Sequence, residues 1–274
     1  MRARNGCPVA RWLAALVIAS ALVADDNAGL AAQGRRSPIR VAAASSLTNA
    51  LTEIARAYES NSGEAVALSF GASGVLARQI SEGASVDLFF SADEAQTRVV
   101  EAAGRLEPNT RVSLLSNQLV VVVPAERPRS FQSPQDLLDP AIRRIAIGDP
   151  ATTPAGVYAR RYLELVGLWT ELQPRIIPMT TVRAALAAAE SGDVDAAFVY
   201  RSDAATTQRA TVAMTIPRDR TPGIVYQAAL VKGSNRLEAA RRFLTYLKGA
   251  DARAVFEREG FIVIVRIERE PPTR

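Results

Sequence analysis

Histidine is absent from the 274-residue sequence, and its only cysteine is Cys7. Cys7 precedes an apolar N-terminal run, so a chain that loses this segment contains neither residue. Their absence excludes zinc sites built from cysteine and histidine, thiol nucleophiles and Ser-His-Asp catalysis. It also excludes disulfide bonds, so the hydrophobic core must stabilise the protein, and a chain of this length can form one.

Lysine is scarce as well, and Lys232 and Lys248 are the only two. The formal net charge is +5 at pH 7, with 33 basic and 28 acidic residues. These charges are interspersed, and no basic block alternates with aromatic residues as it would in a nucleic-acid-binding surface. We therefore expect no nucleic-acid partner.

The N-terminal segment has the three parts of a secretory signal peptide. Arg2, Arg4 and Arg11 precede an apolar run from Trp12 to Ala24, and small residues follow. The run is too short to span a bilayer comfortably, and no later stretch approaches about 20 apolar residues. We predict a signal peptide in residues 1–32, ending between residues 24 and 32, and no stable membrane insertion.

Strand-like apolar runs alternate with helical apolar spacing from residue 39 to residue 260, which predicts an α/β fold with mostly parallel sheets. Ser45 or Ser46 is expected to cap the first helix, and Thr180 or Thr181 a later one. The expected strands are residues 39–44, 65–70, 86–90, 114–124, 144–147, 176–177, 194–200 and 223–231. The expected helices are residues 47–58, 75–82, 93–103, 134–144, 157–166, 182–191, 235–249 and 250–260.

Two of these strands, residues 114–124 and 223–231, are interpreted as crossings between two lobes. The first lobe would contain residues 33–117 and 231–274, and the second would contain residues 118–230. Two sheets joined by two crossings form a hinged pair, and ligands of such sheets bind outside the carboxyl ends of the strands.

Neutral hydrogen-bond donors gather at five predicted strand ends. Turns around Ser46, Ser73, Ala155 and Val182 lead from strands into helices, and Tyr200 ends another strand. Serine hydroxyls, first-turn amides and a phenol all donate, and none of these turns requires a charged side chain. Such a site suits a small oxyanion without protons. Phosphate suits it poorly, because its remaining proton would find no acceptor.

Six motifs of the chain are similar to those of one known family, the periplasmic molybdate-binding proteins of ABC transporters. The similarity covers residues 38–261, in order and with matching gaps. The motifs are A-A-S-S-L-T-N-A (43–50), S-F-G-A-S-G-V-L-A-R-Q-I (69–80), D-L-F-F-S-A-D (87–93), G-D-P-A-T-T-P-A-G-V-Y-A (148–159), V-R-A-A-L (182–186) and V-Y-R-S-D-A (199–204).

The resemblance implies a type II periplasmic binding protein, not an enzyme, that closes on molybdate or tungstate between two lobes. It implies hydroxyl donors at Ser46 and Ser73, backbone amides at Ala155 and Val182, and the phenol of Tyr200. Molybdenum would be bound only as molybdate, through these same residues, and no cofactor is expected. The protein would act in the periplasm, as a monomer, and deliver its ligand to an ABC-transporter permease.

Two alternative functions stay open at this point, a receptor for sulfate or an organic acid, and a secreted enzyme on the same scaffold. An organic acid usually needs a charged clamp, and the sequence offers no clear position for one. An enzyme without histidine and cysteine would have to use carboxylates or a serine–lysine pair, but neither lysine lies near a motif serine. Asp87, Asp93 and Asp149 are interpreted as turn and cap residues.

Three features differ from the family pattern or are left without a role. Ser45 stands where the family often has alanine, and the Gly71–Gly74 turn is less serine-rich. The tail after Phe261 would be a short strand or an unstructured end.

Replacing Ser46 and Ser73 with alanine is expected to weaken binding with little effect on the stability of the free protein.

Overall fold

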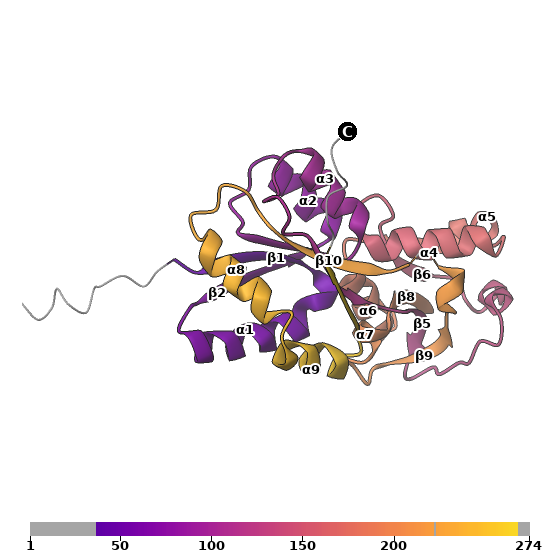
Figure 1. The fold of residues 1–274 in the computed structure, drawn as a ribbon. Coiled ribbons are helices and arrows are strands. Elements are labelled where there is room, and N and C mark those ends of the chain that lie inside the picture. Colours follow the sequence, from indigo (N-terminus) through magenta and orange to yellow (C-terminus); the bar gives the residue numbers. More distant parts are fainter. Residues whose placement is uncertain (1–36, 222, 268–274) are drawn as a thin grey trace, which may run out of the picture. The chain divides into compact units, whose positions relative to one another are not determined.

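Two β-sheets with flanking helices make up the protein in the computed structural model, which describes residues 37–221 and 223–267 (Figure 1). The predicted signal peptide lies outside the described residues. The first sheet has six strands in the spatial order β11 (Ile262–Ile267), β4 (Val112–Ser116), β10 (Val225–Leu230), β3 (Leu88–Ser91), β1 (Ile39–Ala44) and β2 (Val66–Gly71). The second has five in the order β7 (Ile176–Met179), β6 (Ile145–Gly148), β8 (Ala196–Tyr200), β5 (Leu119–Pro124) and β9 (Ala210–Thr215).

Both sheets are mixed, which differs from the expectation of mostly parallel sheets. Strand β1 is parallel to β2 and β3, and β6 is parallel to β7 and β8. The remaining neighbours pair antiparallel. The hydrophobic pattern does not encode strand direction. Parallel neighbours need a helical crossover between them, and the strands that cross between the sheets are not joined to their neighbours in this way.

The expected long strand 114–124 is two strands that belong to different sheets. Strand β4 lies in the first sheet, β5 lies in the second, and Asn117 and Gln118 join them. After β9 the chain returns to the first sheet in β10, which pairs with β3 and β4. Residues 225–230 therefore lie in the first sheet, although the predicted second lobe extended to residue 230. Strand β9 has no counterpart in the prediction.

The start of the first helix differs from the predicted serine cap. Ser45 and Ser46 form a 3-10 turn, η1 (Ser45–Leu47), and α1 (Thr48–Ser62) follows without a side-chain cap. The hydroxyl of Ser46 contacts a tyrosine of β10 instead of the helix backbone. The other predicted cap is confirmed, because Thr181 Oγ accepts a hydrogen bond from Ala184 N at 3.0 Å at the start of α6 (Val182–Glu190).

The remaining α-helices are α2 (Ser73–Ser81), α3 (Glu94–Ala102), α4 (Pro154–Leu165), α5 (Trp169–Leu172), α7 (Arg201–Ala204), α8 (Leu237–Tyr246) and α9 (Ala250–Arg258). Short 3-10 turns are η2 (Pro134–Leu138), η3 (Gln173–Arg175) and η4 (Arg218–Arg220). The expected helix 134–144 is only η2, because Pro140 disfavours helical backbone at the residue before it. Within the ranges described, no helix is both long and apolar enough to cross a membrane.

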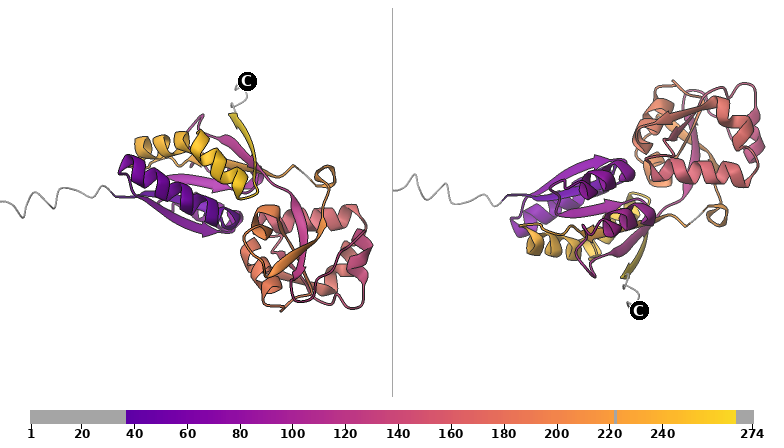
Figure 2. Two further views of the ribbon diagram at one scale, coloured as in Figure 1. Left: turned by 90° about the horizontal axis from the view of Figure 1, so that it is seen from below. Right: turned by 90° about the horizontal axis from the view of Figure 1, so that it is seen from above.

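Helices cover both faces of the six-stranded sheet. Alternate residues of β1 point to opposite faces, so Val41 and Ala43 belong to the main hydrophobic core and Ala42 to a smaller one. Helices α1, α8 and α9 pack on the face of Val41 and Ala43, and α2 and α3 pack on the face of Ala42 (Figure 2). Strand β11 pairs with β4 at the edge, which confirms the strand interpretation of the tail as far as Ile267.

The start of α4 lies unusually close to the end of β6. Thr153 Oγ caps α4 by accepting a hydrogen bond from Gly156 N at 3.1 Å, and it donates to Asp149 O at 3.0 Å. A Cβ atom on Gly156 would lie 1.8 Å from the carbonyl oxygen of Gly148. The absence of a side chain at residue 156 therefore lets the helix start beside the strand end.

We expect Gly156→Ala to lower the free energy of unfolding by about 1–3 kcal/mol. Alanine stabilises a helix by about 1 kcal/mol relative to glycine. The carbonyl oxygen of Gly148 must move to make room for the new Cβ atom, however, and the clash outweighs this gain. Urea unfolding of the purified protein measures the difference. Gly223→Ala is the control, because a Cβ there meets no atom within 4 Å; equal stability of the two variants would contradict the prediction.

Candidate functional site

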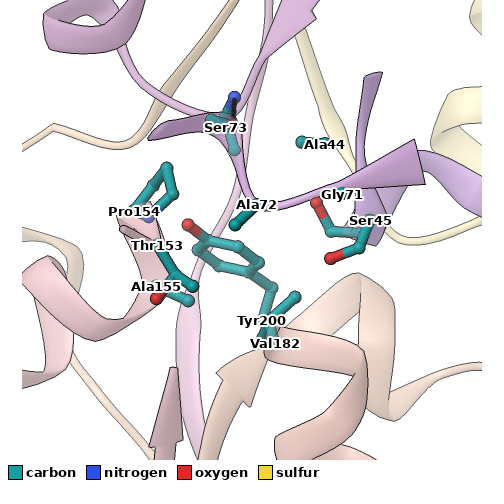
Figure 3. A pocket seen from close by; sticks show the side chains of 12 residues that line it. Ala44, Ser45, Gly71, Ala72, Ser73, Thr153, Pro154, Ala155, Val182 and Tyr200 are labelled. Carbon is teal, nitrogen blue, oxygen red and sulfur yellow. Dashed lines mark hydrogen bonds between the residues drawn. The ribbon is translucent and has the colours of Figure 1, made fainter. Parts of the chain in front are cut away.

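A small pocket lies where strand ends of both sheets meet the starts of helices. It includes all five predicted site residues, and Figure 3 shows the ring of Tyr200 in the middle of the lining side chains. The space between its walls, including the open mouth, measures about 220 Å³. The lining residues are Ala44, Ser45, Ser46, Gly71, Ala72, Ser73, Ala92, Thr153, Pro154, Ala155, Val182 and Tyr200.

The pocket suits a ligand smaller than a typical organic cofactor. Drug-sized ligands occupy pockets of roughly 300–1,000 Å³. The five predicted residues are all buried, so a ligand among them would be largely shielded from water. Shielding strengthens each hydrogen bond to an anion, because the local dielectric constant is low.

Three α-helices begin at the pocket, α2 at Ser73, α4 at Pro154 and α6 at Val182. First-turn amides of a helix have no partner within the helix. The cap residues of α4 and α6 each accept from a later amide. The amides of Ala155 and Val182 make no hydrogen bond within the described residues. Both can therefore donate to a ligand, at the positive end of a helix dipole.

The two predicted serines are held by hydrogen bonds from behind. Ser73 Oγ accepts from the amide of Ala92 at 3.0 Å. Ser46 Oγ lies 3.0 Å from the hydroxyl oxygen of Tyr226, and both residues are buried. Because both hydroxyls satisfy other buried polar groups, their removal would affect the free protein too. These hydrogen bonds argue against the expectation that the serine-to-alanine changes have little effect on the stability of the free protein.

Tyr200 brings a hydroxyl into the pocket that has no partner. Its side chain is 1% exposed, and its hydroxyl oxygen makes no hydrogen bond within the described part of the chain. Burial, with Tyr226 and nearby carboxylates adding smaller effects, raises the pKa of Tyr200 well above its usual value. The phenol therefore keeps its hydrogen and is a donor without an acceptor. Buried polar atoms of native proteins nearly always have partners, so this hydroxyl is available to donate to a bound group.

None of the lining residues is charged, and one ion pair lies close to the pocket. Arg183 Nε lies 2.7 Å from Asp203 Oδ1, just behind Tyr200. Burial raises the pKa of Asp203 to about 6, and the positive charge of Arg183 opposes that rise. Asp93 accepts from Gln96 N and caps α3, as predicted. No group of three or more acidic side chains that could hold a metal ion occurs in the described ranges.

Sequence reasoning missed the residues behind the pocket. Tyr226, Asn117 and Ser202 form buried hydrogen bonds that connect Ser46 to the crossing between the sheets. They lie far apart in the sequence, so no local pattern identifies them. Gly74 was seen only as part of a turn, but its amide donates to Thr152 O at 3.0 Å and links the helix start of one sheet to a turn of the other.

The chain is similar to several characterised proteins. Residues 39–262 match the family model described as bacterial extracellular solute-binding protein. The molybdate-binding protein ModA of Escherichia coli (strain K12) is 37% identical over 259 residues, which cover 92% of this chain and 98% of that protein. The solved structure of the Azotobacter vinelandii periplasmic molybdate-binding protein has a TM-score of 0.75 and 28% identity, covering 82% of this chain and 98% of that one.

The sulfate-binding protein SubI of Mycobacterium tuberculosis H37Rv has a TM-score of 0.70 at 19% identity, covering 82% of this chain and 86% of that one. At this identity the similarity concerns the fold alone. Proteins that share this fold are thus named for different ligands, so the fold alone does not identify the ligand of this chain.

We expect Ser73→Ala to lower the unfolding free energy of the ligand-free protein by about 1–3 kcal/mol, because the buried amide of Ala92 loses its acceptor. Urea unfolding without added oxyanion measures this loss. Ser45→Ala is the matched control in the same pocket, since the Ser45 hydroxyl makes no hydrogen bond to any described residue. The prediction is wrong if the two variants lose the same stability.

Proposed function

The chain belongs to the family of bacterial extracellular solute-binding proteins, and we propose that it captures molybdate or tungstate and delivers it to an ABC-transporter permease. The buried, unpartnered hydroxyl of Tyr200 in an uncharged pocket carries this proposal. An oxyanion there would accept from Tyr200, from the hydroxyls of Ser46 and Ser73, and from the amides of Ala155 and Val182. The protein would act as a receptor and not as an enzyme.

The chemistry of the donors supports a doubly charged anion without protons. Molybdate, tungstate and sulfate each offer acceptors in all directions, and aligned amide and hydroxyl dipoles can stabilise a dianion without a paired cation. Hydrogen phosphate would bring an O–H group among donors. Its unsatisfied proton would cost about 1–3 kcal/mol. Size then separates sulfate from the larger molybdate and tungstate, and the relatives named for molybdate support the larger ions.

We propose that the ligand is enclosed between two lobes built on the two sheets. In this proposal the first crossing is at residues 117–118 and the second lies between β9 and β10, which is supported by the pairing of β10 in the first sheet. The Gly74–Thr152 backbone hydrogen bond would then form on closure. Export to the periplasm by the predicted signal peptide in residues 1–32, and action as a monomer, complete the proposal.

Calorimetric titration of the mature protein should give tight binding of molybdate and tungstate, and much weaker binding of sulfate. The two larger anions are nearly alike in size and chemistry, so no preference between them is predicted. Hydrogen phosphate is the negative control. No binding of molybdate, or an equal affinity for sulfate, would contradict the proposed function.

We expect Tyr200→Phe to weaken molybdate binding by about tenfold to a hundredfold, the value of one hydrogen bond to a charged group. The ligand-free variant should be as stable as the wild type or more stable, because the lost hydroxyl has no partner to leave behind. Calorimetry and urea unfolding test the two effects together.

Tyr162→Phe is the matched control for this change. Tyr162 is a buried tyrosine of α4 that packs against Phe198, and it does not line the pocket. Its hydroxyl can be removed without touching a ligand, so molybdate affinity should be unchanged. A similar loss of affinity in both variants would mean that Tyr200 does not donate to the ligand.

A further inference from the structure

Behind Ser46, three buried side chains connect the pocket to the crossing between the sheets. Tyr226 on β10 is 0% exposed, Asn117 in the crossing is 2% exposed, and Ser202 on α7 is 1% exposed. Asn117 Nδ2 lies 2.8 Å from Ser202 Oγ and 3.3 Å from the hydroxyl oxygen of Tyr226. Tyr226 in turn lies 3.0 Å from Ser46 Oγ. Of these residues, only Ser46 lines the pocket.

The direction of these hydrogen bonds is set by the backbone. The amide of Gln118 donates to Asn117 Oδ1 at 2.9 Å. A backbone N–H can only donate, so the side-chain oxygen of Asn117 must face it. The NH₂ group of Asn117 is thereby turned to Ser202 and Tyr226. An amide nitrogen donates and does not accept, so both oxygens receive hydrogens from Asn117.

The hydrogen of Tyr226 then has one acceptor. Its oxygen accepts from Asn117, and its own hydrogen can reach only Ser46 Oγ among the described residues. Burial raises the pKa of Tyr226 well above its usual value, so the phenol keeps that hydrogen. Because Tyr226 donates to Ser46 Oγ, the hydrogen of Ser46 cannot point back at Tyr226. It turns to the pocket side, where a ligand oxygen can accept it.

We propose that Asn117 and Tyr226 are positioning residues that fix Ser46 as a hydrogen-bond donor and so make the pocket selective for oxyanions without protons. This inference rests on the proposed function. Ser73 is oriented in the same way by the amide of Ala92, a donor that no substitution can reverse. Ser46 differs because its orientation depends on side chains, so its preference can be changed by mutation.

The hydrogen bonds from Asn117 to Tyr226 and from Tyr226 to Ser46 form a relay, and Asn117→Asp should reverse their direction. One carboxylate oxygen still accepts from Gln118, and the other now accepts from Tyr226, since it has no hydrogen to give. Tyr226 oxygen is then free to accept from Ser46, whose lone pairs face the pocket. A protonated oxyanion gains the acceptor that it lacked, and a proton-free oxyanion loses a donor.

The test is the displacement of bound molybdate by sulfate and by hydrogen phosphate at pH 8, where both have the same charge and only phosphate retains a proton. The wild type should prefer sulfate. In Asn117→Asp, the sulfate-to-phosphate affinity ratio should fall by about tenfold. A negative charge alone weakens both dianions equally, so the ratio isolates the proton.

Gln118→Glu is the matched control for charge. It adds a carboxylate at the neighbouring residue, whose side chain bonds to Ile216 O and not to the relay. Its sulfate-to-phosphate ratio should equal that of the wild type.

Tyr226→Phe removes the relay without adding charge. Molybdate affinity should fall about tenfold, and the sulfate-to-phosphate ratio should narrow, because Ser46 can rotate. Tyr58→Phe is the control. It removes a hydrogen bond of 2.9 Å between the hydroxyl of Tyr58 and Glu64, which do not line the pocket, and should change neither the molybdate affinity nor the sulfate-to-phosphate ratio. An unchanged ratio in both Asn117→Asp and Tyr226→Phe would overturn the inference. Failure of the proposed function would appear earlier, as a wild type that does not bind molybdate.

Discussion

The register of β5 against β8 determines where the pocket lies. Leu119, the first residue of β5, pairs with Tyr200, the last residue of β8. Tyr200 therefore lies opposite the residue that directly follows the crossing at Asn117 and Gln118, where the chain passes from one sheet to the other. The amide of Arg201 donates to Gln118 O at 2.8 Å and holds the same point. The antiparallel pairing of β5 with β8 thus positions both the phenol of Tyr200 and the side-chain amide of Asn117.

The electrostatics of the pocket follow from its neutral lining. A buried anion needs hydrogen bonds, because burial without them costs several kcal/mol. In the proposed site, two helix-start amides, of Ala155 and Val182, and three hydroxyls would supply these bonds without a cation in the pocket. Arg183 is paired with Asp203, so its charge is not available to a ligand. Such a site would recognise the number and direction of acceptors more than total charge, and this property would separate sulfate from hydrogen phosphate.

Much of this arrangement could be predicted from the sequence, because it depends on local patterns. Apolar runs and helical spacing gave β1, α6 and the Thr181 cap, and the motifs gave the five positions that line the pocket. Strand direction, β9 and the Ser46–Tyr226 contact could not be predicted. The last joins residues 180 positions apart, and a serine at a helix start has the same sequence signal whether it caps the helix or bonds a distant phenol.

The contact between Gly74 and Thr152 explains why closure would need the ligand. A Cβ atom on Gly74 would lie 2.6 Å from Thr152 O, so the two backbones approach as closely as a hydrogen bond allows. One such bond contributes about 1 kcal/mol, which changes the ratio of closed to open forms by only about fivefold. If the proposed site is right, an anion would accept from Ser46 and Ser73 on one side and from Ala155, Val182 and Tyr200 on the other, and these charge-assisted bonds would exist together only when the lobes meet. The preference of the anion for the closed form would then exceed that of the backbone contact, as a ligand-driven shift requires.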